Sequence, residues 1–335
     1  MKIPQLGVSY FGNRFLSHAK TDLDRLTGCC DYIVHTVSES DLTYHKSIMA
    51  KIFNETRKRG LEVWADPWGL GGVFGGEAYS KFLLDHRKAW QVMSDGRFVP
   101  GACMNRPEFR SYVMEWVLSV RDMGAQVIFW DEPHMIFDLD SEWDGIYSCT
   151  CEVCQETFKK KYGTPQPPRL NEHAREFRRF TIKNFLTQMM AFAKSKGLKN
   201  ALCLYAFKGN AEYDVIWKEA ASVPDLDIFG CDPYWRWRSR QDPGTHVKDF
   251  SKRVIDATKP FGKQTQIWIQ AMRLPAQAES EILRACQAAL DEGITHLAAW
   301  SYDGGELLDT VLSERPQEVW DTVQKAYALI RAQRG

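Results

Sequence analysis

The sequence has no excess of charge of either sign and no long apolar run. Its 335 residues include 43 Lys and Arg and 43 Asp and Glu, so net charge favours neither nucleic acid nor an anionic membrane as partner. No apolar run reaches the roughly 18–20 residues that a membrane-spanning helix needs. The first five residues also lack the apolar segment of a signal peptide. We therefore expect a cytoplasmic protein without a nucleic-acid or membrane partner. Assembly into a homo-oligomer is possible on these grounds.

Two phosphate-binding signatures are also missing. No strand-like run is followed by Gly-x-Gly-x-x-Gly, and the glycine-rich stretch 69–76 is not followed by Gly-Lys-Ser/Thr. We interpret that stretch as a mobile substrate-binding loop. No Pro-, Gly- or Ser-rich segment is long enough to separate two domains, so residues 1–335 are predicted to form one domain.

Short apolar runs alternate with amphipathic stretches along the whole chain. The runs predict eight strands, at 6–11, 32–37, 61–65, 126–130, 201–206, 226–231, 264–271 and 297–301. Helical spacing falls between them, at 13–27, 44–59, 107–123, 172–196, 212–222, 245–258, 277–292 and 316–332. Eight such repeats in a chain of this length predict an α/β fold, a (β/α)8 TIM barrel. A doubly wound open sheet is the alternative.

The candidate active site lies where the strands end. The fourth run, Val127-Ile128-Phe129-Trp130, stops at Asp131 and Glu132, and Pro133 cannot continue a central strand. In a barrel the side chains that follow each strand converge on one mouth. The other candidates there are Asp66, Trp68, Tyr205, Asp232, Tyr234, Trp235, Gln270, Arg273, Trp300, Tyr302 and Asp303. Adjacent carboxylates raise one pKa, which suits a general acid, whereas single acids often only cap the next helix.

The sequence is also rich in aromatic residues, with twelve Trp and 13% Phe, Trp and Tyr. Most aromatic side chains pack in cores. Those that follow strands beside acids would also suit a carbohydrate, because their faces stack on sugar C–H groups.

Three cysteines lie within six residues, at Cys149, Cys151 and Cys154, in an insertion predicted at 133–170. Such spacing is typical of metal ligands, and a structural zinc ion needs four thiolate or imidazole groups. Cys103 is one candidate for the fourth ligand, and His134 and His173 are others. Free cysteines without a role are the alternative, since disulfides are rare in a reducing compartment.

These residues carry a resemblance to a known family. A lone Cys103, then Cys149-x-Cys151-x-x-Cys154 followed by Phe158 and Tyr162-Gly163, is similar to the zinc-cluster β-galactosidases of glycoside hydrolase family forty-two. The resemblance implies a TIM barrel, a structural zinc ion on these four cysteines and a carbohydrate substrate. Asp131-Glu132-Pro133 stands where the wider clan carries its acid/base motif, so Glu132 would be the proton donor.

Two departures from that pattern leave the mechanism open. Asp131 stands where the clan has Asn, and Gln270 stands at the end of the seventh strand, where the clan has a nucleophilic Glu. Asp232 or Asp303 could activate water in an inverting reaction, and Asp232, Asp66 or Asp303 could act as nucleophile. The pair Asp131-Glu132 also resembles the acetamido-assisted hexosaminidases, in which a later Tyr, here Tyr234, assists. A barrel that binds carbohydrate without cleaving it is the alternative from a different class.

Overall fold

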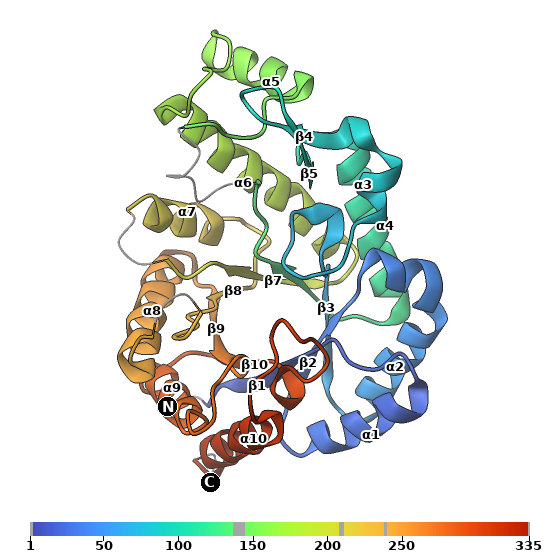
Figure 1. Ribbon diagram of the computed structural model, residues 1–335, viewed down its shortest axis with the longest axis vertical. Helices are drawn as coiled ribbons and strands as arrows, with labels where there is room; N and C mark the ends of the chain where they lie inside the picture. Colours follow the sequence, from blue (N-terminus) through green and yellow to red (C-terminus); the bar gives the residue numbers. More distant parts are fainter. Residues whose placement is uncertain (1–2, 137–144, 208–210, 238–239, 334–335) are drawn as a thin grey trace.

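The computed structural model describes residues 3–136, 145–207, 211–237 and 240–333. Eight parallel strands close into a barrel with the spatial order β1-β10-β9-β8-β7-β6-β3-β2, and helices surround it (Figure 1). The predicted (β/α)8 barrel is confirmed. The barrel strands are β1 (Gln5–Tyr10), β2 (Tyr32–Thr36), β3 (Glu62–Asp66), β6 (Val127–Asp131), β7 (Lys199–Leu204), β8 (Ile228–Cys231), β9 (Gln264–Gln270) and β10 (His296–Trp300).

The helices between these strands also follow the sequence pattern. The helix that begins at Pro107, a residue favoured in the first turn, ends before Gly124, whose φ of 109° favours glycine. The outer helices are α1 (Leu16–Thr27), α2 (Lys46–Lys58), α4 (Pro107–Met123), α6 (Glu172–Ser195), α7 (Ala211–Ala221), α8 (Pro243–Thr258), α9 (Glu281–Asp291) and α10 (Pro316–Ala332). The predicted stretch 44–59 divides, because a π-helical turn (Asp41–His45) precedes α2.

Alternation along the strands separates two apolar clusters. On β6, Val127 and Phe129 lie in a cluster inside the barrel, whereas Ile128 and Trp130 lie in the larger core between barrel and helices. Successive side chains of a strand point to opposite faces, so every second residue faces the barrel axis. This alternation decides which side chains reach the mouth.

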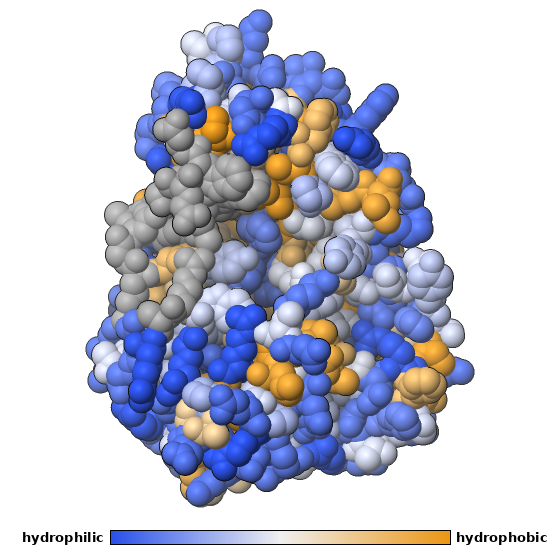
Figure 2. Space-filling model, viewed as in Figure 1, coloured by the Kyte–Doolittle hydropathy of each residue, from blue (hydrophilic) through white to orange (hydrophobic). Residues whose placement is uncertain are grey.

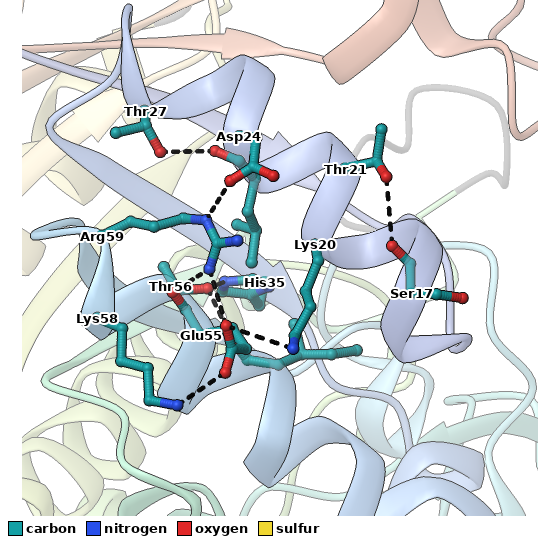
Figure 3. A network of polar contacts seen from close by, with 12 residues as sticks. Ser17, Lys20, Thr21, Asp24, Thr27, His35, Glu55, Thr56, Lys58 and Arg59 are labelled. Atoms are coloured by element: carbon teal, nitrogen blue, oxygen red, sulfur yellow. Dashed lines mark hydrogen bonds and ion pairs between the residues drawn. The ribbon is translucent and has the colours of Figure 1, made fainter.

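Helices α1 and α2 are joined on the outside of the barrel by the guanidinium group of Arg59 (Figure 3). Its Nε donates to Asp24 at 2.8 Å and its Nη1 to Glu55 at 2.9 Å. On the inner side of α2, His35 is buried and its Nε2 lies 3.0 Å from the Thr56 hydroxyl. Burial lowers the pKa of His35 to about 3, so this histidine is neutral and packs against the helix.

The segments after β3 and β6 depart from the predicted loops. Residues after β3 form α3 (Lys81–Asp85) and an antiparallel hairpin of β4 (Trp90–Val92) and β5 (Phe98–Ala102). The predicted insertion 133–170, of which residues 137–144 lie outside the described residues, contains the helix α5 (Glu152–Tyr162). The hairpin, α5 and part of α6 lie together at one end of the molecule, in the upper part of Figure 1.

The described helices include none that is both long and apolar enough to cross a membrane. The face shown in Figure 2 is mostly hydrophilic, and its hydrophobic residues lie in small separate groups.

Candidate active site

A cavity of about 620 Å³ lies at the carboxyl ends of the barrel strands. Its floor includes Phe129 and Trp268, whose ring centroids are 5.0 Å apart, and the glycine-rich loop forms part of its wall. The titratable side chains that line it are Asp66, Glu77, Asp131, Glu132, His134, Cys203, Tyr205, Asp232, Tyr234 and His246. The mouth of the barrel therefore holds five acids around a space large enough for a small ligand.

Three of these acids face the cavity because of strand alternation. Asp66 ends β3 and Asp131 ends β6, each two residues beyond a member of the inner cluster, Trp64 or Phe129. Asp232 directly follows β8, four residues beyond Ile228 of the same cluster. The strands β3 and β6 are paired neighbours, so Asp66 and Asp131 lie on the same side of the mouth.

Glu132 reaches the same cavity by a different route. Strict alternation would turn it outward, but its φ of 42° lies in the left-handed region, which is uncommon outside glycine. Its backbone N–H donates to the carbonyl of Cys203 at 3.0 Å, and its side chain lies within hydrogen-bonding reach of Tyr205 and Asp232. Strained backbone of this kind is concentrated at functional sites.

Glu132 and Asp232 form a carboxyl pair that shares a hydrogen bond. Burial and the neighbouring Asp232 raise the pKa of Glu132 well above its usual value. Burial also raises the pKa of Asp232, to about 7, although the hydrogen bond from Glu132 lowers it. The pair therefore keeps a proton to a higher pH than isolated carboxyl groups would.

Asp66 and Asp131 form a second group of acids. Burial and the charge of Asp131 raise the pKa of Asp66, while burial, Glu132 and Glu77 raise the pKa of Asp131. Asp66 is 2% exposed, and its Oδ1 has no hydrogen-bond partner. A buried carboxylate oxygen without a partner is costly, which makes it a candidate ligand contact.

The glycine-rich loop packs its backbone directly on Asp131. The N–H of Gly75 donates to the carbonyl of Asp131 at 3.0 Å. A Cβ at Gly75 would lie 2.2 Å from the Asp131 carboxylate oxygen, so no larger residue fits without movement. Glu39 holds the loop from behind by accepting the N–H of Gly71 at 3.0 Å.

Aromatic rings form another part of the cavity wall. Trp68 and Trp300 are stacked with ring centroids 6.1 Å apart, and Tyr234 lies 6.5 Å from Trp300. All three line the cavity, as does Tyr205. Flat apolar faces beside carboxylates provide both kinds of contact that a sugar ring needs.

Three predicted contact residues lie outside the lining. Trp235 is buried in the core and its Nε1 donates to Glu281 at 2.8 Å. The side-chain oxygen of Gln270 accepts the N–H of Arg236 at 3.0 Å. Arg273 stacks its guanidinium 4.2 Å from the ring centroid of Trp237. The structure uses these side chains to fix the loops after β8 and β9.

Tyr302 and Asp303 also point away from the cavity, toward α1. The Tyr302 hydroxyl donates to Asp22 at 3.1 Å, and Arg25 pairs with Asp303 at 3.0 Å. Asp303 is therefore held by an ion pair outside the site.

Conversely, sequence reasoning missed Glu77, Trp237 and Trp268 as lining residues. Strand alternation could have found Trp268, but nothing in the sequence marks Glu77, which comes from a loop.

The four predicted metal-ligand cysteines lie together beside this site. The sulfurs of Cys103, Cys149, Cys151 and Cys154 all lie within 4.8 Å of one another, and each cysteine is free and buried. The Cys103 sulfur is 3.4 Å from that of Cys154 and 3.6 Å from that of Cys151. Tetrahedral Zn–S bonds of about 2.3 Å would place such sulfurs about 3.8 Å apart, so the donor set fits a structural metal ion.

Neither histidine candidate belongs to that cluster. The Nδ1 of His134 lies 2.8 Å from the carbonyl of Glu132, and His173 stacks on Tyr162. The N–H of Val92 donates to the Cys149 sulfur at 3.4 Å, as is common around metal-bound thiolates. The cluster therefore connects the hairpin, through Cys103 and Val92, to the start of α5.

Comparisons with known proteins identify the fold. No protein-family model and no curated protein matches the sequence. A β-galactosidase from the Antarctic haloarchaeon Halorubrum lacusprofundi has a TM-score of 0.72 at 11% identity, over 98% of this chain and 58% of that one. The β-amylase catalytic domain from Paenibacillus polymyxa gives 0.64 at 11% identity, over 97% and 99%.

A D-allulose 3-epimerase from Methylomonas sp. is also similar, with a TM-score of 0.53 at 10% identity over 99% of both chains. The chain thus spans little more than half the length of the β-galactosidase and nearly all of the other two. At such identities the likeness shows the barrel fold alone, and the chemistry has to be argued from the cavity.

Proposed function

We propose that the protein is a glycoside hydrolase in which Glu132 donates the proton to the leaving oxygen. The observation that carries the proposal is the half-buried pair of Glu132 and Asp232 at the mouth of the barrel. Hydrolysis of a glycosidic bond needs an acid that is still protonated near neutral pH. Burial and the neighbouring Asp232 raise the pKa of Glu132, while a hydrogen bond from Tyr205 lowers it and holds the carboxyl in place.

The second catalytic group is a carboxylate on the other face of the sugar. Asp232 is unsuited to hold a water molecule, because it contacts Glu132 directly and an inverting pair is about 6.5–9.5 Å apart. Asp66 and Asp131 remain, on the neighbouring strands β3 and β6. The aromatic wall of Trp68 and Trp300 would bind the sugar face. The stereochemistry of the product, followed by NMR, distinguishes a nucleophile from a general base.

The direct test compares Glu132→Gln with Glu156→Gln, an exposed residue on α5. We expect kcat/KM on an aryl glycoside to fall about 10³-fold in the first variant, because an amide cannot donate the proton, and to stay unchanged in the second. Ligand binding, measured by calorimetry, should persist in both. If the parent cleaves no glycoside of a panel that includes N-acetylated sugars, the barrel binds carbohydrate without hydrolysing it.

We further propose that Cys103, Cys149, Cys151 and Cys154 hold a structural zinc ion. The support is a closed, buried set of four sulfurs with no room for substrate. Zinc bound there contributes folding energy, which would fix the loop after β6. Met135, three residues after Glu132, packs within this cluster. Loss of the ion would therefore disturb the segment that carries the acid.

Metal analysis and one pair of variants test this site. We expect about one zinc ion per purified chain, lost in Cys154→Ser and retained in Cys286→Ser, whose thiol is buried on α9. The first variant should also unfold at lower temperature, because an unliganded cluster leaves buried thiols unsatisfied. Well under one zinc ion per chain in the parent would contradict the proposal.

A further inference from the structure

Five acidic side chains line the cavity at the mouth of the barrel. Its lining includes Asp66, Glu77, Asp131, Glu132 and Asp232, and no lysine or arginine among the residues that the structure describes. Arg273 is the cation that acts on Glu77, and it lies outside the lining, stacked on Trp237. The two histidines that line the cavity are His134 and His246.

The acids divide into two groups with different partners. Glu132 shares a hydrogen bond with Asp232 and another with Tyr205, which suits the proposed proton donor. Asp66 lines the cavity and has no hydrogen-bond partner for its Oδ1. The Oδ1 of Asp232 also lacks one, but Asp66, at 2% exposed, is the more deeply buried of the two residues. Like-charged Asp131 lies beside it. A buried carboxylate beside a half-buried one of like charge is stabilised best by a cation placed between them.

A second observation points to a ligand rather than to buried charge alone. Trp268 lines the same cavity and is 2% exposed, and its indole Nε1 also has no hydrogen-bond partner. The walls thus present an unpaired carboxylate oxygen and an unpaired N–H donor around a space of about 620 Å³. A sugar with a cationic group and a free hydroxyl would satisfy both.

We propose that the substrate is the glycoside of an unacetylated amino sugar, whose ammonium group lies against Asp66 and Asp131. This inference rests on the proposed hydrolysis and names its substrate class. It assigns Asp66 to recognition and leaves Asp131 as the second catalytic carboxylate. A uronic acid would be repelled by the acids of the wall, and an acetamido group would leave the Asp66 oxygen without a charged partner.

The proposed substrate class can be tested by measuring how glycosides bind to the inactive Glu132→Gln variant, which does not turn them over. The probes are methyl glycosides of 2-amino-2-deoxyglucose and 2-amino-2-deoxygalactose in both anomers, with their 2-hydroxy, 2-acetamido and uronic acid counterparts. At pH 6 we expect the best amino sugar to bind at least about tenfold more tightly than its 2-hydroxy counterpart. Equal or tighter binding of the neutral sugar, or no binding of any amino sugar at millimolar concentration, overturns the inference.

A further substitution locates the cation. Asp66→Asn added to Glu132→Gln should reduce the preference for the amino sugar to about twofold or less, because one carboxylate is lost. Asp256→Asn, on the exposed face of α8, should leave it unchanged. A retained preference in the Asp66 variant overturns the assignment. If that variant does not fold, a second measurement tests the assignment. Calorimetry in two buffers gives the number of protons released when a sugar binds to the Glu132→Gln protein. An amino sugar should displace protons from the cavity acids, and a neutral sugar should not.

The two proposals fail in different ways. If the parent enzyme cleaves neutral glycosides and does not prefer amino sugars, the proposed hydrolysis stands and the proposed substrate class is wrong. If the protein binds amino sugars preferentially but cleaves no glycoside, the proposed ligand class stands and the proposed hydrolysis is wrong.

Discussion

The two ends of the barrel carry hollows of similar size, about 620 Å³ at the carboxyl ends of the strands and about 610 Å³ at their amino ends. At the amino end the acids are paired. Glu62 binds Lys199 at 2.9 Å, and Asp31 binds Arg331 at 2.8 Å and accepts the N–H of Leu6. At the carboxyl end five acids face one another without a lysine or arginine in the described lining.

This difference shows how the fold separates stability from chemistry. Paired charges at the amino end hold the starts of the strands together, as Glu62 on β3 and Lys199 on β7 do across β6. Like charges at the mouth are costly to bury and are tolerated where they shift a pKa that a reaction uses. Substitutions at the mouth should therefore change activity, whereas matched substitutions at the amino end should change stability and leave activity nearly unchanged.

Among these tests, the largest effect is expected at Gly75, whose backbone packs against Asp131. Gly75→Ala would place a methyl group 2.2 Å from the Asp131 carboxylate, so that either the side chain or the loop must move. We expect kcat/KM to fall about 100-fold, the order of loss that misplacement by about 1 Å causes. Gly28→Ala, where a Cβ would meet nothing within 4 Å, is the control. An unchanged rate for Gly75→Ala would show that Asp131 takes no part in the reaction.

How far the sequence predicted this arrangement depends on the kind of signal. All eight strands were predictable because each is a short apolar run, and the cysteine spacing predicted three members of the cluster. The inward positions of Asp66, Asp131 and Asp232 follow from alternation along a strand. The loops after the strands obey no such period, so Trp235, Tyr302 and Asp303 were expected at the mouth although they pack elsewhere.

Other features of the site could not be predicted from the sequence at all. The positive φ of Glu132, which brings its carboxyl beside Asp232, depends on the bond from its N–H to Cys203 on the neighbouring strand. The two strands of the hairpin, β4 and β5, contain only eight residues and lack a long apolar run. The helix α5 begins among the cysteines, whose spacing indicates metal binding rather than a helix start.

A smaller effect is expected on stability at pH 8. The folded-state pKa values of Asp66 and Asp131 are raised, so the stability associated with them is present below about pH 4 and is lost as pH rises through those values. Asp66→Asn should remove part of this loss and raise the free energy of unfolding by about 1–2 kcal/mol at pH 8. Asp31→Asn, at the amino end, should lower it because a paired charge is lost. Urea unfolding at pH 5 and pH 8 measures both, and a destabilised Asp66→Asn at pH 8 would contradict the comparison.

The smallest effect is expected for the ion pair at the amino end. The Lys199 side chain is 58% exposed and that of Glu62 28%, so solvent screens the contact although its atoms are 2.9 Å apart. Lys199→Met should lower the free energy of unfolding by less than about 1 kcal/mol and leave kcat/KM unchanged. Raising the salt concentration should lower the free energy of unfolding of the parent by a similar amount and leave that of the variant unchanged. A loss of activity in Lys199→Met would mean that the amino end is coupled to the mouth through β7, and the two ends could no longer be treated as independent.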